Sequence, residues 1–82
     1  MLWKGMLFRG SSRGDEWMVR LALKGGTSVI ETRNWLGQTS LHMAARGGHS
    51  GAVRLLLNEG ADINAVDWQD LTPLASAVLE RR

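Results

Sequence analysis

The spacing of apolar residues predicts short helices joined by turns. Beyond Thr39, apolar side chains recur at positions i, i+3 and i+4, which places them on one helical face: Leu41, Ala44 and Ala45. We expect this helix to begin at Ser40, because the Thr39 hydroxyl can accept a hydrogen bond from the first turn. Gly48 suits the left-handed position that ends a helix. Thr72 and Pro73 predict a similar helix start later in the chain.

The same pattern recurs with a period of 33 to 34 residues. NWLGQTSLHMAA, from residue 34, aligns with DWQDLTPLASAV, from residue 67. An offset of 34 aligns Val19-Arg20-Leu21 with Val53-Arg54-Leu55. Such a period indicates a repeat protein, so we expect one domain, 1–82, with a divergent repeat at 1–33, a full repeat at 34–66 and a truncated repeat at 67–82.

A second helix is expected in the full repeat at about residues 50–58, followed by a helix end at Gly60. Its apolar side chains occupy more than half of its circumference: Ala52, Val53, Leu55, Leu56 and Leu57. A helix at a surface has a narrower apolar stripe. We therefore expect this helix to be covered on two sides, by its partner helix and by a neighbouring repeat.

This repeat resembles the ankyrin repeat. The residues that carry the resemblance are Gly37, Thr39, Leu41, His42, Ala44, Ala45, Gly48, His49, Val53, Leu55 to Leu57, Gly60 to Asn64, Asp67, Thr72, Pro73 and Leu74. The resemblance implies an all-α, ankyrin-like stack of helix–turn–helix repeats, a solenoid with short β-hairpin-type turns. It also implies a structural role for His42, and His49 fits the start of the second helix.

The truncated repeat departs from the pattern. Ala75 stands where the full repeat has His42, and Asp70 stands where it has the turn glycine Gly37. Asp tolerates a left-handed conformation better than most residues but less well than Gly. Without a second helix in this repeat, Leu74, Val78 and Leu56 are expected to lack full cover. We therefore expect a fragment, a short isoform, or a piece completed by a partner.

Composition argues against several kinds of chemistry. The 82 residues include no Cys, so neither a disulfide nor a thiolate metal site can form. The two His residues lack a third metal ligand at a suitable spacing. Neither KGGTS nor GGHSG has the order of a phosphate-binding loop, and no nucleophile–base–acid set has the context of a catalytic triad. We predict no enzyme, no cofactor, no metal and no small-molecule substrate.

The location and partner classes are also constrained. No stretch approaches the ~18 consecutive apolar residues of a membrane helix, so we expect no membrane insertion and an intracellular protein, cytoplasmic or nuclear. Ten Lys and Arg against eight Asp and Glu give a net charge of +2, which is a weak field. Nucleic-acid binding is thus a lesser alternative, which a steep salt dependence would reveal.

The favoured function is non-catalytic binding of a protein partner whose identity the sequence does not name. By resemblance, the variable residues that line the concave face and the hairpin fingertips are Trp35, Leu36, Gln38, Arg46, Trp68, Gln69 and Leu71. Alternatively, the two indoles pack on neighbouring turns. We expect Trp17, on a second helix, to be packed. Another alternative is a truncated array without independent activity, which self-associates through its uncovered C-terminal repeat.

Overall fold

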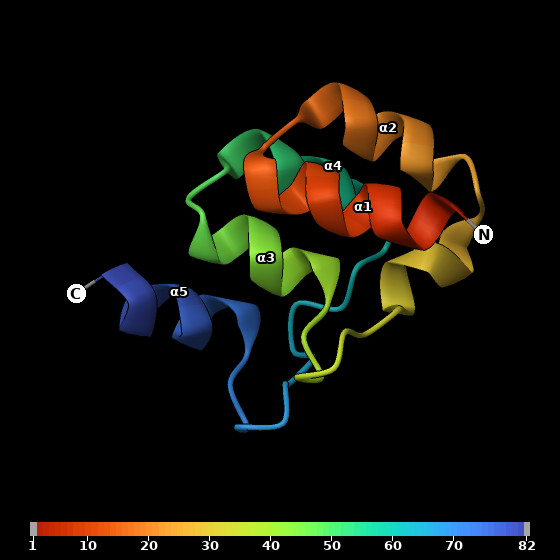
Figure 1. Ribbon diagram of the computed structural model, residues 1–82. Helices are drawn as coiled ribbons and strands as arrows, with labels where there is room; N and C mark the ends of the chain where they lie inside the picture. The colour runs from red at the N-terminus through yellow and green to blue at the C-terminus, as the bar shows by residue number, and fades with distance from the viewer. Residues whose placement is uncertain (1, 82) are drawn as a thin grey trace.

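The computed structural model describes residues 2–81, with the side chains of that range except those of residues 2, 27 and 81. Helices and turns make up this part of the chain, which contains no strand (Figure 1). The elements are α1 (Leu2–Arg13), α2 (Glu16–Leu23), the 3-10 helix η1 (Thr27–Glu31), α3 (Ser40–Arg46), α4 (Ser50–Asn58) and α5 (Pro73–Arg81). The predicted all-α class is confirmed.

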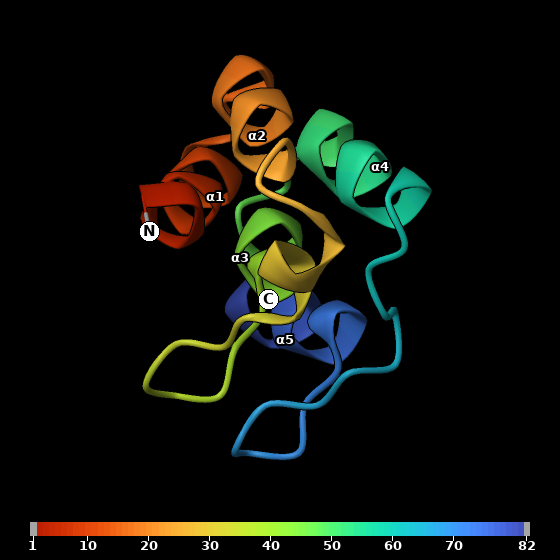
Figure 2. The same cartoon turned by 90° about the vertical axis from the view of Figure 1, so that its right-hand side faces the viewer.

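The helices form two layers. α1, α3 and α5 lie side by side in one row and run in the same direction, and α2 and α4 form a second layer (Figures 1 and 2). Contacts join α1 to α2 and α3 to α4 as helix pairs, and they also join α1 to α3, α3 to α5 and α2 to α4. The helices α3 and α5, from successive repeats, are therefore neighbours, as the expected stack of repeats requires.

Local capping explains where these helices begin and end. The Thr39 hydroxyl accepts a hydrogen bond from the His42 N–H at 3.4 Å, and α3 begins at Ser40 as predicted. Thr72 caps α5 in the same way, through the Ala75 N–H at 3.2 Å. After α3, Gly48 has the left-handed φ of 72° that the helix end requires.

The core lies between the layers and contains several small side chains. Its buried apolar residues are Leu7, Val19, Ala22, Val29, Leu41, Ala44, Ala52 and Leu56. Alanines at these positions let neighbouring helices approach closely, because a methyl group adds little thickness to a helix.

One expectation about the core is wrong. Leu56 is fully buried at 0% exposure, since it packs into the core cluster, and it does not lack cover. Its neighbour Leu57 is exposed and lines an open hollow with Ala45 and Val53. α4 nevertheless contacts both its partner helix α3 and α2 of the preceding repeat, so the expected cover on two sides is present. Leu74 and Val78 on α5 are 70% and 64% exposed, as expected.

Candidate functional site

Two tight turns project from the row of α1, α3 and α5; we call residues 34–38 finger 1 and residues 67–71 finger 2 (Figure 2). In finger 1, the Asn34 N–H donates to the Gln38 carbonyl at 2.9 Å. The Asn34 side-chain oxygen accepts the N–H groups of Leu36 and Gln38, each at 2.9 Å. This pattern is a β-hairpin-type turn closed by an Asn side chain.

Finger 2 repeats this hydrogen bonding with an aspartate. The Asp67 N–H donates to the Leu71 carbonyl at 3.0 Å, and Oδ1 of Asp67 accepts the N–H groups of Gln69 and Leu71. Asp70 takes φ of 67°, where finger 1 has Gly37 at 77°. The chemical match of Asn34 with Asp67 thus reflects one turn design that is used twice.

The two fingers are joined to each other. The Trp68 N–H donates to the Leu36 carbonyl at 3.2 Å. Nη1 of Arg33 donates to the carbonyls of Gly37 and Val66, both at 2.7 Å, and so bridges the base of the two fingers. The Trp68 ring lies against Gly37, at a place where a Cβ atom would overlap it. Several hydrogen bonds therefore set the spacing between the fingers.

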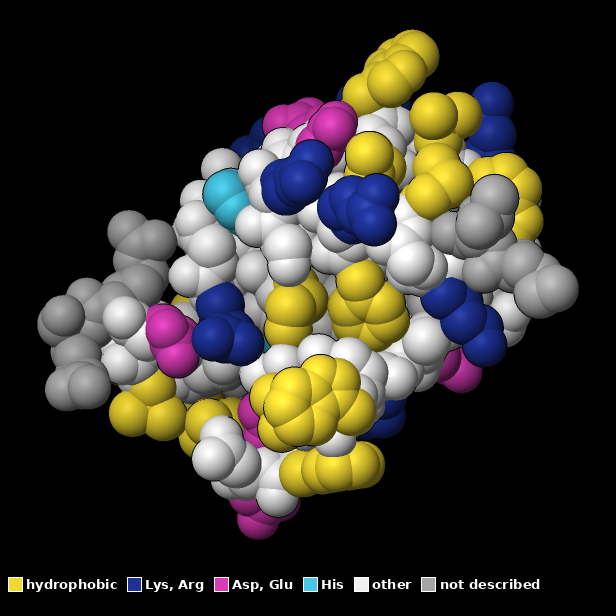
Figure 3. Space-filling model, in the orientation of Figure 1, with side chains coloured by type: hydrophobic (Ala, Val, Ile, Leu, Met, Phe, Trp, Pro, Cys, Tyr) yellow, Lys and Arg dark blue, Asp and Glu magenta, His cyan; other side chains and the backbone are white. Residues whose placement is uncertain are grey.

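The fingertips expose large apolar side chains. Trp35 is 78% exposed and Trp68 is 74% exposed, and both Leu36 and Gln69 are exposed beside them. Hydrophobic side chains accordingly gather over the fingers at the lower edge of the molecule (Figure 3). The alternative that the indoles pack on neighbouring turns describes Trp68 in part, because its ring lies against Gly37 of finger 1 while most of the side chain stays exposed.

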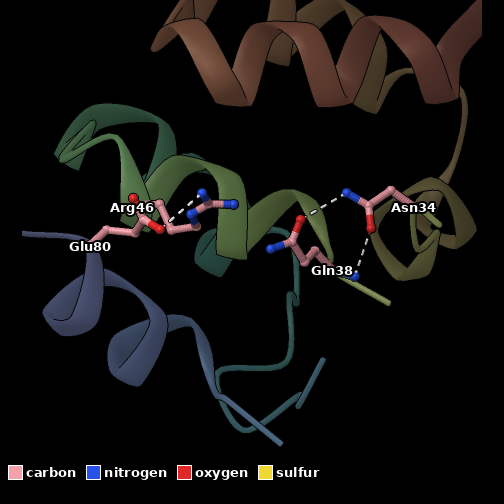
Figure 4. Close-up of polar contacts among 4 residues, drawn as sticks. All are labelled: Asn34, Gln38, Arg46 and Glu80. Carbon is pink, nitrogen blue, oxygen red and sulfur yellow. Dashed lines mark hydrogen bonds and ion pairs between the residues drawn. The ribbon is translucent and has the colours of Figure 1, made fainter. Parts of the chain in front are cut away.

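Gln38 does not belong to this exposed set. It is only 7% exposed, and its side-chain Oε1 accepts a hydrogen bond from Nδ2 of Asn34 at 3.0 Å (Figure 4). The expectation that Gln38 faces a partner is therefore corrected: its side chain holds finger 1 in shape. Leu71 is half-buried, and its carbonyl lies 2.8 Å from Nε2 of His42.

Arg46 lies at the opposite end of α3 from the fingers (Figure 4). Its Nη2 is 3.3 Å from Oε2 of Glu80, so an ion pair links α3 to α5. The pair lines a hollow of about 270 Å³ together with Ser12, Met43 and Gly47. The seven predicted contact residues therefore divide into six at the fingers and Arg46, which lies at the far end of the two-turn helix α3.

Trp17 is a further correction. It is 73% exposed on α2, and is not packed as expected. The side chains of α2 that pack inward are Val19 and Ala22, which leaves Trp17 on the outer side of the helix. Sequence reasoning missed this, because the apolar pattern of α2 alone does not reveal which side its neighbours α1 and α4 cover.

Two other kinds of feature, a metal site and a membrane-spanning helix, were sought in the described part of the chain. Within residues 2–81, no three His, Asp or Glu side chains gather where they could hold a metal ion. In the same range, every helix is too short or too polar to cross a membrane.

Helix pairs stacked side by side, with fingers that project where one repeat passes into the next, define a helical repeat protein of the solenoid class. The chain belongs to the ankyrin-repeat family: the family description "Ankyrin repeats (3 copies)" matches residues 7–82. Ankyrin repeats generally mediate protein–protein interactions, and the family is typically non-enzymatic.

Known relatives are much longer than the matched segment. The chain is 35% identical over 72 residues to a transient receptor potential cation channel subfamily A member 1 homologue of Caenorhabditis elegans, covering 88% of this chain and 6% of that protein. It is 42% identical over 50 residues to the NF-kappa-B inhibitor cactus of Drosophila melanogaster, covering 60% of this chain and 10% of cactus. It is 34% identical over 73 residues to an L-asparaginase of Dirofilaria immitis, covering 89% of this chain and 12% of that enzyme.

Proposed function

We propose that this protein is a non-catalytic module that binds a protein partner through its fingertips and the groove between the fingers and the row α1, α3 and α5. The observation that carries the proposal is the exposure of Trp35 and Trp68, at 78% and 74%, on two adjacent fingers of the same design. Trp is among the residues that most often dominate binding energy at protein interfaces. Two such side chains at a set spacing form a suitable anchor.

The rigidity of the fingers supports the proposal. Residues 34–38 and 67–71 are held by backbone bonds, by the side chains of Asn34 and Asp67, and by the Arg33 bridge. A surface that is already ordered loses little conformational entropy on binding, so more of the contact energy appears as affinity.

The relatives support the binding of a protein partner, and they do not support an enzymatic activity taken over from the L-asparaginase. Cactus is named as an inhibitor of another protein, which is the kind of action that a binding module performs. The L-asparaginase match covers 12% of that enzyme. A match to so small a part of an enzyme does not carry its activity to this chain, because function follows from a site and not from a shared fold.

The experiment compares three tryptophan substitutions. Trp35→Ala and Trp68→Ala remove the fingertip indoles, and Trp17→Ala removes an equally exposed indole from α2, which serves as the matched control. Proteins captured from a cell extract on each immobilised variant are quantified by mass spectrometry. We expect partners that both finger variants lose, by at least about tenfold, and that Trp17→Ala retains. Equal capture by all four proteins would refute the assigned surface, provided circular dichroism shows unchanged helix content.

Self-association is a second candidate, and the exposed apolar residues of α5 favour it. Leu74 and Val78 are 70% and 64% exposed one turn apart on that helix. We expect sedimentation velocity to show a concentration-dependent increase in mass over about a hundredfold range of concentration, which the double variant Leu74→Glu, Val78→Glu abolishes. A wild-type chain that stays monomeric throughout that range would exclude this candidate.

A further inference from the structure

The charged side chains of α1 and α3 have one sign. Within their bounds, α1 carries Lys4, Arg9 and Arg13, and α3 carries Arg46, while neither helix contains Asp or Glu. All eight acidic residues of the chain lie elsewhere. In Figure 3, which views the molecule from the side of α1, α3 and α5, Lys and Arg side chains spread over the middle of the face and Asp and Glu side chains lie around its margin.

Most of these cations have no carboxylate partner. Among the residues that the structure describes, the Arg46–Glu80 contact is the single ion pair, and both of its side chains are partly exposed. Lys4 and Arg9 are exposed on α1 without a carboxylate within 4.0 Å in that same range. α1 therefore offers positive charge that the fold itself leaves unneutralised.

Apolar side chains lie among the charges. Phe8 on α1 and Met43 on α3 are half-buried, so each keeps part of its surface open. Met43 borders the hollow of about 270 Å³ between α1, α3 and α5 that Ser12, Arg46, Gly47 and Glu80 also line. Met side chains adapt readily to the shape of a bound apolar group.

We propose that the groove binds an acidic segment of a protein partner, in which Asp or Glu side chains alternate with apolar ones. Its carboxylates pair with Lys4 and Arg9, and its apolar residues contact Phe8 and Met43 before reaching the indoles of the fingers. This inference rests on the proposed function and adds the chemistry of the partner. Charge complementarity of this kind selects among partners and speeds their association.

The same observations disfavour a nucleic acid. Phosphate backbones carry closely spaced negative charges along their whole length. Finger 2 presents the exposed Asp70 in its turn, and Glu31 and Asp62 line a cavity of about 250 Å³ with Arg33 at the finger base. A strand long enough to use the cations of α1 and the indoles of the fingers would meet these carboxylates, whereas a peptide can be acidic at one end and apolar at the other.

The test selects ligands from a library of random peptides displayed on phage, with the complete 82-residue chain as bait. Selected peptides are synthesised, and their Kd values are measured by fluorescence anisotropy. We expect net-negative peptides with apolar residues between the acids. Arg9→Glu should weaken their binding by about tenfold, since it turns an attraction into a repulsion, and added salt should weaken it as well. Arg20→Glu makes the same change at an exposed position of α2, away from the groove, and is the matched control. It should change Kd by less than about twofold.

The outcomes separate this inference from the function on which it rests. Neutral or basic peptides that need both fingertip indoles but ignore Arg9→Glu would overturn the acidic-segment inference and leave the proposed function standing. Peptides that ignore Trp35→Ala and Trp68→Ala would overturn the proposed function. Binding of a single-stranded DNA oligonucleotide more tightly than any selected peptide, with loss on Arg9→Glu, would also overturn the inference, in favour of a nucleic acid.

Discussion

His42 joins two repeats, and its replacement should be among the most costly changes in the chain. The side chain is fully buried. The Thr39 N–H lies 3.2 Å from Nδ1 and can only donate, so Nδ1 is the acceptor and the neutral ring carries its proton on Nε2. Nε2 then donates to the Leu71 carbonyl of finger 2 at 2.8 Å. One imidazole thereby closes the start of α3 and holds the next finger.

The magnitude follows from the bonds that are lost. His42→Phe preserves most of the volume but leaves the buried Thr39 N–H without a partner, whereas the Leu71 carbonyl loses one bond and keeps the Asp67 N–H as a donor. An unpaired buried group costs about 1–3 kcal/mol, so we expect a loss in that range in the free energy of unfolding. His42→Ala adds a cavity and should lose about 3–5 kcal/mol. A domain of this size has about 4–12 kcal/mol in total, so either loss is large.

Urea unfolding followed by far-ultraviolet circular dichroism measures these losses. His49→Ala is the control, since His49 is half-buried and makes one bond, to the Ser12 carbonyl at 3.0 Å. It should lose about 1 kcal/mol or less. A His42→Phe variant as stable as the wild type, or a His49→Ala loss equal to that of His42→Ala, would refute the role assigned to the inter-repeat bonds.

Three further changes test other parts of the fold by thermal or urea unfolding. Asp70→Gly should raise the free energy of unfolding by about 0.5–1 kcal/mol, because Asp70 holds φ of 67°; no gain would show that its turn is unstrained. Gly51→Ala inside α4 should add about 0.5–1 kcal/mol of helix propensity, since only the movable end of the exposed Glu16 side chain occupies the Cβ position; a loss would mean that Glu16 cannot move. Glu80→Gln should cost less than about 0.5 kcal/mol at low salt and nothing measurable at high salt, because the Arg46–Glu80 pair is solvent-exposed; a larger, salt-independent loss would contradict this.

Features that depend on a few adjacent residues were predictable from the sequence. Thr39 and Thr72 cap the helices that follow them, and Gly48 supplies a left-handed helix end. Each of these is a contact within one turn of chain, so the residue types and their spacing contain the information. The repeat period predicted the side-by-side arrangement of α3 and α5 for a similar reason. Repeats of the same design stack on one another in the same way, so equivalent helices become neighbours.

Features that depend on other repeats were not predictable in the same way. Leu56 and Leu57 are adjacent and chemically identical, yet the first is buried and the second is exposed. Their fates depend on the rotation of α4 relative to α2 and α3, which the apolar pattern leaves open because it covers too much of the helix. Gln38 looked like a surface residue because it is polar, and only the Asn34 amide shows that it belongs inside its turn.

The Arg33 bridge has a consequence for mechanics. Because one guanidinium donates to carbonyls in and beside both fingers, and Trp68 bonds to the backbone of finger 1, neither tip can swing alone without breaking hydrogen bonds that belong to the other. The two fingers should therefore move together as one rigid unit. A displacement of Trp35 is then transmitted to Trp68, and the spacing between the two indoles stays the same when a ligand binds.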